Sequence, residues 1–190
     1  MTDRLESFRA ADGGYNHVPG AEHGTAYGAF LALGAYEDTG AEVPDPDRLA
    51  DSLARLRADD GGYAGSPGAA TGLVPSTAAA VVTLSALGRT VDAAAVQWLT
   101  DRQQPAGGWP AVPGAPTADL LSTATALHAL AAAGATLADD ARAAARAFVE
   151  SLIEPADAAA DAAGFRGHAA DTVADCEYTF YGLLALGHVT

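Results

Sequence analysis

The chain has 190 residues and a mass of 19.0 kDa, which favours a single domain over residues 1–190 that buries its core without disulfides. Its 24 acidic residues outnumber 10 basic residues, all arginine, and the formal net charge of −14 disfavours nucleic acids and anionic membranes as partners. A single cysteine, Cys176, excludes an internal disulfide. Because the sequence has no run of about 18 uncharged apolar residues and no basic-then-apolar leader, we expect a cytoplasmic protein without a membrane span.

A motif that recurs four times organises the chain. Each copy has two small residues, mostly glycines, before an aromatic residue, and successive aromatic residues are 48, 46 and 56 positions apart. These aromatic residues are Tyr15, Tyr63, Trp109 and Phe165, the last within Ala162-Ala163-Gly164-Phe165. Self-similarity at such a period is typical of repeat architectures. We therefore predict four repeats, at approximately 1–40, 41–90, 91–135 and 136–190.

A threonine follows the aromatic residue in every repeat. The distance is 14 residues in three repeats, which end at Thr77, Thr123 and Thr179. In the first repeat Thr25 follows Tyr15 after only 10 residues, which predicts a shortened loop there. Each threonine opens an apolar run that ends at a glycine, so the motif marks the loop before a helix and the residue after it.

Each repeat is predicted to form two helices joined to the glycine-rich loop. The second helices are apolar nearly all round, which places them in an interior layer. Their predicted ranges are 22–34, 73–87, 117–133 and 174–187. The other helices keep a polar face, as in 137–153, where apolar residues recur at the helical period. Alternating inner and outer helices indicate stacked hairpins in two concentric layers.

The aromatic residue of each loop has two interpretations. Its ring either plugs the seam between hairpins, where glycines allow the backbones to approach closely, or it lines a hydrophobic cavity. We favour the plug, and keep Trp109 as a candidate substrate-binding residue under the second interpretation.

The repeat resembles the protein prenyltransferase β-subunit and squalene cyclase superfamily. The Gly-Gly-aromatic loop, the Asp-x-x-x-Thr helix start and the Ala/Leu-rich helix carry the resemblance, most clearly in Gly107-Gly108-Trp109 with Asp119 and Thr123. It implies an all-α fold, an α/α toroid-like array of four helical hairpins whose inner helices surround an apolar cavity for isoprenoid chains.

Four hairpins are fewer than a full toroid of this superfamily contains. A short array leaves two apolar ends that must be covered, and the last predicted helix ends on the apolar segment 181–186. We therefore expect a partial ring that a second copy or a partner chain completes. The alternatives are a closed small barrel or terminal residues that cover the ends.

In the prenyltransferases, an Asp-x-Cys-Tyr segment and a histidine bind zinc, and here the segment is Asp175-Cys176-Glu177-Tyr178. The resemblance implies catalytic roles for Asp175, Glu177 and Tyr178. Because one residue turns about 100° round a helix, Cys176 and Glu177 cannot both face the cavity as the family cysteine does. Asp175 and Glu177 could hold Zn or Mg through oxygens, with Cys176, or with His23 of a second chain, as a further ligand. The alternative makes Asp175 a helix N-cap and Cys176 a buried small residue.

The family holds the diphosphate with basic residues in the loop before this segment. Here that loop offers Arg166 and His168, and Tyr181 follows on the inner helix, so these three are candidate substrate-binding residues. The same loop carries Asp171, and an ion pair on the surface is the competing role for Arg166.

The cyclase branch has Asp-x-Asp-Asp-Thr at the same helix start, with a protonated aspartic acid that attacks an alkene or epoxide. Glu177 stands at the third place of this motif and Tyr178 at the fourth. A glutamic acid in an apolar cavity stays protonated because desolvation raises its pKa. Three hypotheses follow: a metal-dependent transferase-like protein that binds isoprenoids, a non-catalytic binding module on the same scaffold, and a cyclase-like enzyme with Glu177 as its acid.

Overall fold

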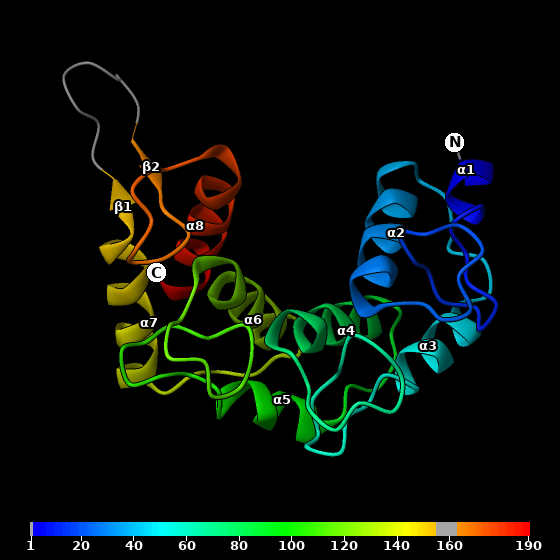
Figure 1. Ribbon diagram of the computed structural model, residues 1–190, viewed down its shortest axis with the longest axis horizontal. Helices are drawn as coiled ribbons and strands as arrows, with labels where there is room; N and C mark the ends of the chain where they lie inside the picture. Colours follow the sequence, from blue (N-terminus) through cyan, green and yellow to red (C-terminus); the bar gives the residue numbers. More distant parts are fainter. Residues whose placement is uncertain (1, 155–162) are drawn as a thin grey trace.

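The computed structural model describes residues 2–154 and 163–190, and it shows helices that follow one another round an open arc (Figure 1). The inner helices are α2 (Ala26–Asp38), α4 (Val74–Ala86), α6 (Leu120–Ala132) and α8 (Cys176–Val189). The outer helices are α1 (Thr2–Glu6), α3 (Pro46–Ala54), α5 (Ala93–Thr100) and α7 (Asp139–Ser151). Ala162 of the fourth motif lies outside the described residues.

The fold is all-α, as predicted, and its inner helices pack in chain order. Helix α2 packs on α4, α4 on α6, and α6 on α8, while α2 and α8 border the opening of the arc (Figure 1). Two short antiparallel strands, β1 (Ile153–Glu154) and β2 (Gly164–Phe165), join the end of α7 to the fourth loop. The part of the chain that the structure describes therefore forms a partial ring and not a closed toroid.

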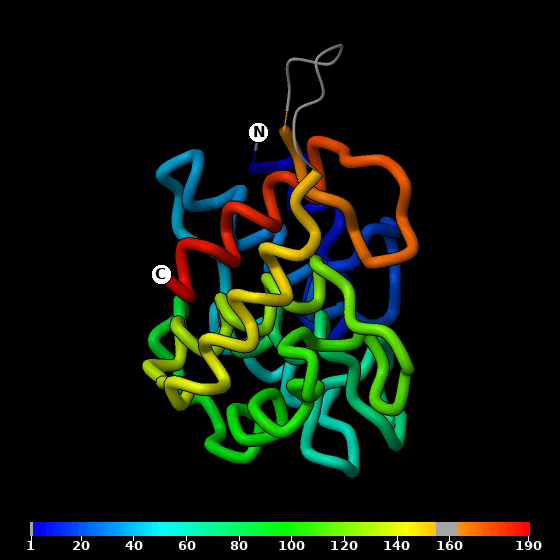
Figure 2. Tube along the Cα trace, turned by 90° about the vertical axis from the view of Figure 1, so that its left-hand side faces the viewer, coloured from blue at the N-terminus to red at the C-terminus, as the bar shows by residue number. Residues whose placement is uncertain are grey.

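The glycine-rich loops all lie at one end of the inner helices, as the side view shows (Figure 2). In every repeat the residue that caps the inner helix donates its N–H to the carbonyl of the aromatic residue ten positions earlier, at 2.8 to 3.4 Å. These pairs are Thr25 with Tyr15, Leu73 with Tyr63, Asp119 with Trp109, and Asp175 with Phe165. The loop is thus closed on itself before the helix begins.

This closure shows that the predicted shortening of the first loop is wrong. Thr25 is the N-cap of α2, the place that Asp119 holds on α6, and the residue 14 positions after Tyr15 is Ala29. The first loop therefore has the same length as the others, and the first repeat lacks the buried threonine instead.

The threonine spacing has a direct structural cause. The hydroxyl oxygens of Thr77, Thr123 and Thr179 accept hydrogen bonds from the backbone N–H of the aromatic residue 14 positions earlier, at 2.8, 2.9 and 3.2 Å. Thr77 and Thr123 are fully buried, so each satisfies a backbone donor that water cannot reach. One side chain thereby ties the loop to the first turn of the inner helix.

The aromatic residues plug the seam between hairpins, as we favoured. Their exposed fractions are 2% for Tyr15, 4% for Tyr63, 0% for Trp109 and 6% for Phe165. The indole N–H of Trp109 donates to the carbonyl of Leu99 on α5 at 2.7 Å. Next to it, Gly107 has a φ of +99°, and a Cβ there would collide with the carbonyl of Ala144 on α7.

A partly buried polar cluster connects the short helix α1 to the first loop and to α2. Glu6 accepts hydrogen bonds from the hydroxyls of Tyr15 and Tyr36, both at 2.6 Å, and from Nε of Arg9 at 2.8 Å. Burial opposes ionisation of Glu6, but the bonds from Arg9 and the two tyrosines outweigh it and lower its pKa to about 2. The carboxylate is therefore charged, and it joins α1, the first loop and α2.

We predict that Thr123→Val destabilises the fold by about 1–3 kcal/mol, because the buried backbone N–H of Trp109 loses its acceptor while valine keeps the shape of the threonine side chain. Denaturant unfolding measures the change. Thr125→Val is the matched control, since the Thr125 hydroxyl donates only to carbonyls of its own helix. Equal losses in both variants would contradict the proposed role of the loop contact.

Candidate ligand-binding surface

One line of residues recurs at the same positions on each inner helix, and most of its members are at least partly accessible. On α6 the half-buried residues are Leu121, Thr125, His128 and Ala132, which recur at the helical period. The corresponding line on every inner helix is here named the concave stripe. It comprises Tyr27, Leu31, Gly34 and Asp38 on α2; Pro75, Ala79, Val82 and Ala86 on α4; the four residues of α6; and Glu177, Tyr181, Leu184 and His188 on α8.

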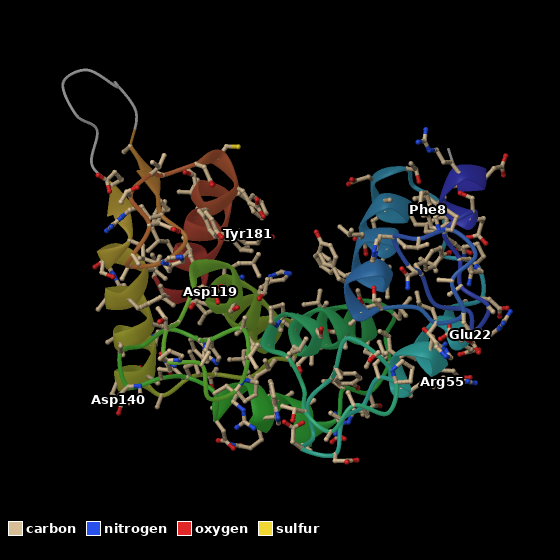
Figure 3. The ribbon with its side chains drawn as sticks, viewed as in Figure 1. Phe8, Glu22, Arg55, Asp119, Asp140 and Tyr181 are labelled. Atoms are coloured by element: carbon tan, nitrogen blue, oxygen red, sulfur yellow. The ribbon has the colours of Figure 1, made fainter. Side chains whose placement is uncertain are left out.

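The other faces of the inner helices are occupied, which leaves the stripe on the hollow side of the arc. The first residue of α6, Leu120, donates its N–H to the carbonyl of Gly167 in the following repeat, so that face meets the next hairpin. Thr123 points to its own loop on the outside. Figure 3 shows Tyr181 on the side of α8 that faces the opening. The stripe therefore lines the concave side.

The two ends of the stripe carry large accessible apolar side chains. Tyr27 and Leu31 on α2 expose 60% and 50% of their surface. On the opposite arm, burial raises the pKa of Tyr181, and nearby Tyr27, Glu177 and Tyr178 raise it further. Tyr27 of the first repeat and Tyr181 of the last lie on helices that border the same opening of the arc (Figure 1). Between them, the stripe offers mostly aliphatic surface.

Two histidines of the stripe, His128 on α6 and His188 on α8, lie next to each other. Nδ1 of His128 on α6 and Nε2 of His188 on α8 are 3.2 Å apart, a hydrogen-bond distance. Burial lowers the pKa of both imidazoles, and the neighbouring His128 lowers that of His188 further. A small pocket of about 150 Å³ is lined by His188 and by Arg142 of α7. A neutral histidine pair therefore joins α6 to α8.

The Asp175–Tyr178 segment begins α8, and the structure separates its members. The Asp175 carboxylate accepts a hydrogen bond from the N–H of Tyr178 at 2.7 Å, so Asp175 is the helix N-cap of the alternative interpretation. Cys176 is exposed, so the prediction of a buried cysteine is wrong. Glu177 lies on the stripe and is exposed, without the desolvation that the cyclase hypothesis needs. Tyr178 is not part of the stripe, because its ring packs against Gly167 in the fourth loop.

These residues do not fit a zinc or magnesium centre within one chain. Among residues 2–154 and 163–190 no three His, Cys, Asp or Glu side chains converge on a common point. The Asp175 carboxylate is engaged as a cap. His23 lies in the first repeat, with Nδ1 3.5 Å from Asp12, at the opposite end of the array from Asp175. A contact between His23 and Asp175 of two different chains stays a prediction.

The predicted diphosphate contacts are already engaged within the fourth loop. Arg166 forms an ion pair with Glu154, with Nε 3.1 Å from the carboxylate, and donates hydrogen bonds to the backbone carbonyls of Asp171 and Ser151. His168 lies 3.1 Å from the Asp171 carboxylate. The surface ion pair considered for Arg166 is therefore confirmed. Trp109 has no exposed surface, so of the four candidate substrate-binding residues only Tyr181 reaches the stripe.

Comparison with known families matches the central repeats. The family model described as the squalene-hopene cyclase N-terminal domain matches residues 47–152, more than half of the chain. The chain belongs to this squalene-hopene cyclase family. The matched region runs from α3 to the end of α7 and includes the loops of Tyr63 and Trp109 with helices α4 and α6. No curated protein matches the chain.

Family membership confirms the resemblance and assigns a terpene-cyclase-like kind. The aliphatic centre of the concave stripe, Val82 and Leu121, falls within the matched region. All of the candidate acid and metal residues, His23 and residues 175–178, fall outside it. None of the helices in the described part of this cyclase-family chain is long and apolar enough to cross a membrane.

The histidine pair predicts that stability falls in mild acid. The folded-state pKa values of His128 and His188 lie below their ordinary value, so the unfolded chain binds more protons as the pH drops. The contribution of the neutral pair to the stability of the fold is therefore fully present above pH 6.5, the ordinary histidine pKa, and decreases as the pH falls below it. The melting temperature should decrease between about pH 7 and about pH 5, and decrease less in the double variant His128→Gln/His188→Gln. An identical pH dependence in both proteins would exclude the pair as the cause.

Proposed function

We propose that the chain is a terpene-cyclase-like protein that binds an isoprenoid, or another long apolar molecule, along the concave stripe. The observation that carries the proposal is the line of partly accessible aliphatic side chains that runs from Leu31 through Val82 and Leu121 to Leu184, one on each inner helix. Burying such surface against a hydrocarbon chain contributes about 25 cal/mol per Å². An extended molecule that contacts Val82, Leu121 and Leu184 would cross three neighbouring helices.

The polar groups of the stripe sit where they would orient such a ligand. Tyr27 and Tyr181 place hydroxyl groups at its two ends, and His128 and His188 lie between α6 and α8. Hydroxyls and neutral imidazoles suit a hydrocarbon chain that carries an alcohol or carbonyl group. The family assignment supports this class of ligand.

A free diphosphate fits the site less well. Arg166 and His168 are paired with acidic residues, and the chain carries a formal net charge of −14. An anionic head group would therefore be repelled by the protein's overall field. Asp38 and Glu177 are carboxyl groups of the stripe itself, and both are exposed, whereas alkene protonation requires an acid that is shielded from water.

Calorimetric titration with farnesol tests the proposal. We expect saturable binding to the purified chain, and at least tenfold weaker binding to Leu121→Asp, because a carboxylate in the centre of the stripe would lose its water when the hydrocarbon chain binds. Val173→Asp is the matched control: Val173 is an exposed apolar residue outside the stripe, and this variant should bind farnesol normally.

Two outcomes would contradict the proposal. Equal farnesol affinity in the wild type and Leu121→Asp would remove the stripe as the binding surface. Farnesyl diphosphate that binds more than about tenfold tighter than farnesol would favour the transferase-like hypothesis instead.

A further inference from the structure

The last inner helix exposes an apolar face that its counterparts cover. Phe180 and Leu183 on α8 expose 62% and 61% of their surface. The residues at the same helical positions on α4 and α6 expose 3% or less; they are Ala78, Val81, Ala124 and Leu127. Those residues pack against the next hairpin of the array. Cys176, Phe180 and Leu183, here named the tail face, thus stand where a further hairpin would pack.

A backbone hydrogen bond crosses the junctions that follow α4 and α6, and the tail face lacks its counterpart within the described residues. The first residue of α4, Val74, donates its N–H to the carbonyl of Ala111, and Leu120 of α6 donates to Gly167, at 3.0 and 2.8 Å. Both acceptors lie two residues after the aromatic residue of the following repeat. Cys176 holds the same place on α8, but its N–H has no such loop acceptor within the described residues.

The first repeat presents the complementary end. A pocket of about 250 Å³ lies between α1 and α2, and its apolar lining includes Leu5, Phe8, Tyr27 and Leu31. His17 also lines it, two residues after Tyr15, at the place that Ala111 and Gly167 hold in their repeats. The pocket is therefore on the side where an interior repeat receives the preceding inner helix.

We propose that a partner polypeptide with helical hairpins of this same repeat kind docks on the tail face and extends to the first-repeat pocket. The occupant follows from continuity with the junctions inside the chain. It supplies a loop carbonyl for the N–H of Cys176, small residues against Phe180 and Leu183, and an inner helix whose large apolar residues fill the pocket.

A second whole copy is a poorer fit for the opening. Helices α2 and α8 border the same opening of the arc (Figure 1). A full copy that continued the array from α8 would add four hairpins beside an opening that α2 already borders. A partner with fewer hairpins needs less of this space.

Affinity capture of the tagged full-length chain from its source cells tests the proposal. We expect a co-purified protein whose sequence carries the Gly-Gly-aromatic loop with a helix start ten residues after the aromatic residue. Capture should fall at least tenfold in Phe180→Asp and persist in Val173→Asp, because both positions are exposed but only Phe180 is on the tail face. Circular dichroism confirms that both variants fold.

A second readout uses the only cysteine of the chain. Cys176 is exposed and lies on the tail face, so iodoacetamide should alkylate it readily in the isolated chain. The purified repeat-bearing partner should slow this alkylation at least tenfold. Capture of no repeat-bearing protein, an unprotected Cys176 in the complex, or self-association of the isolated chain that Phe180→Asp abolishes would each overturn the proposal.

Discussion

The fold depends on one contact, the closure of each glycine-rich loop against the start of its inner helix. The helix-capping residue donates to the aromatic carbonyl ten positions earlier in all four repeats, and in three of them a threonine hydroxyl accepts from the aromatic N–H. This contact fixes where the inner helix begins and buries the aromatic ring in the seam. The buried ring packs in the seam between two hairpins and so fixes how each repeat meets its neighbour. Repetition of this packing makes the array curve round a hollow side.

The hollow side carries the function that we propose. An interior inner helix, α4 or α6, has two faces covered by neighbouring repeats and one by the repeat's own loop and outer helix. The remaining face lines the open side of the arc (Figure 1). The residues of the concave stripe are mainly alanine, valine, leucine and tyrosine, with His128 and His188 paired between α6 and α8. This composition is the basis for the apolar ligand that we propose.

The sequence predicted the fold because the repeat spacing reflects local contacts. The spacing of 14 residues between the aromatic residue and the threonine reflects one hydrogen bond between them. The apolar runs match the inner helices to within a few residues. The prediction of a shortened first loop was wrong because Thr25 is the N-cap of α2. Ala29, 14 residues after Tyr15, occupies the position of the buried threonines in the other repeats. The sequence alone could not reveal the Glu6 cluster or the histidine pair, since Tyr36 is 30 residues from Glu6 and His188 is 60 from His128. The alternative interpretation of Asp175 as a helix cap is confirmed, because its carboxylate accepts from the N–H of Tyr178.

Methyl NMR spectra of the chain with and without farnesol test the central claim most directly. The account predicts shifts of the Val82, Leu121 and Leu184 methyl signals, which lie on three neighbouring inner helices, and unchanged signals for Val112 and Val173, which are exposed elsewhere. Shifts confined to Val112 and Val173, or no shift at a saturating farnesol concentration, would contradict a ligand surface on the concave side.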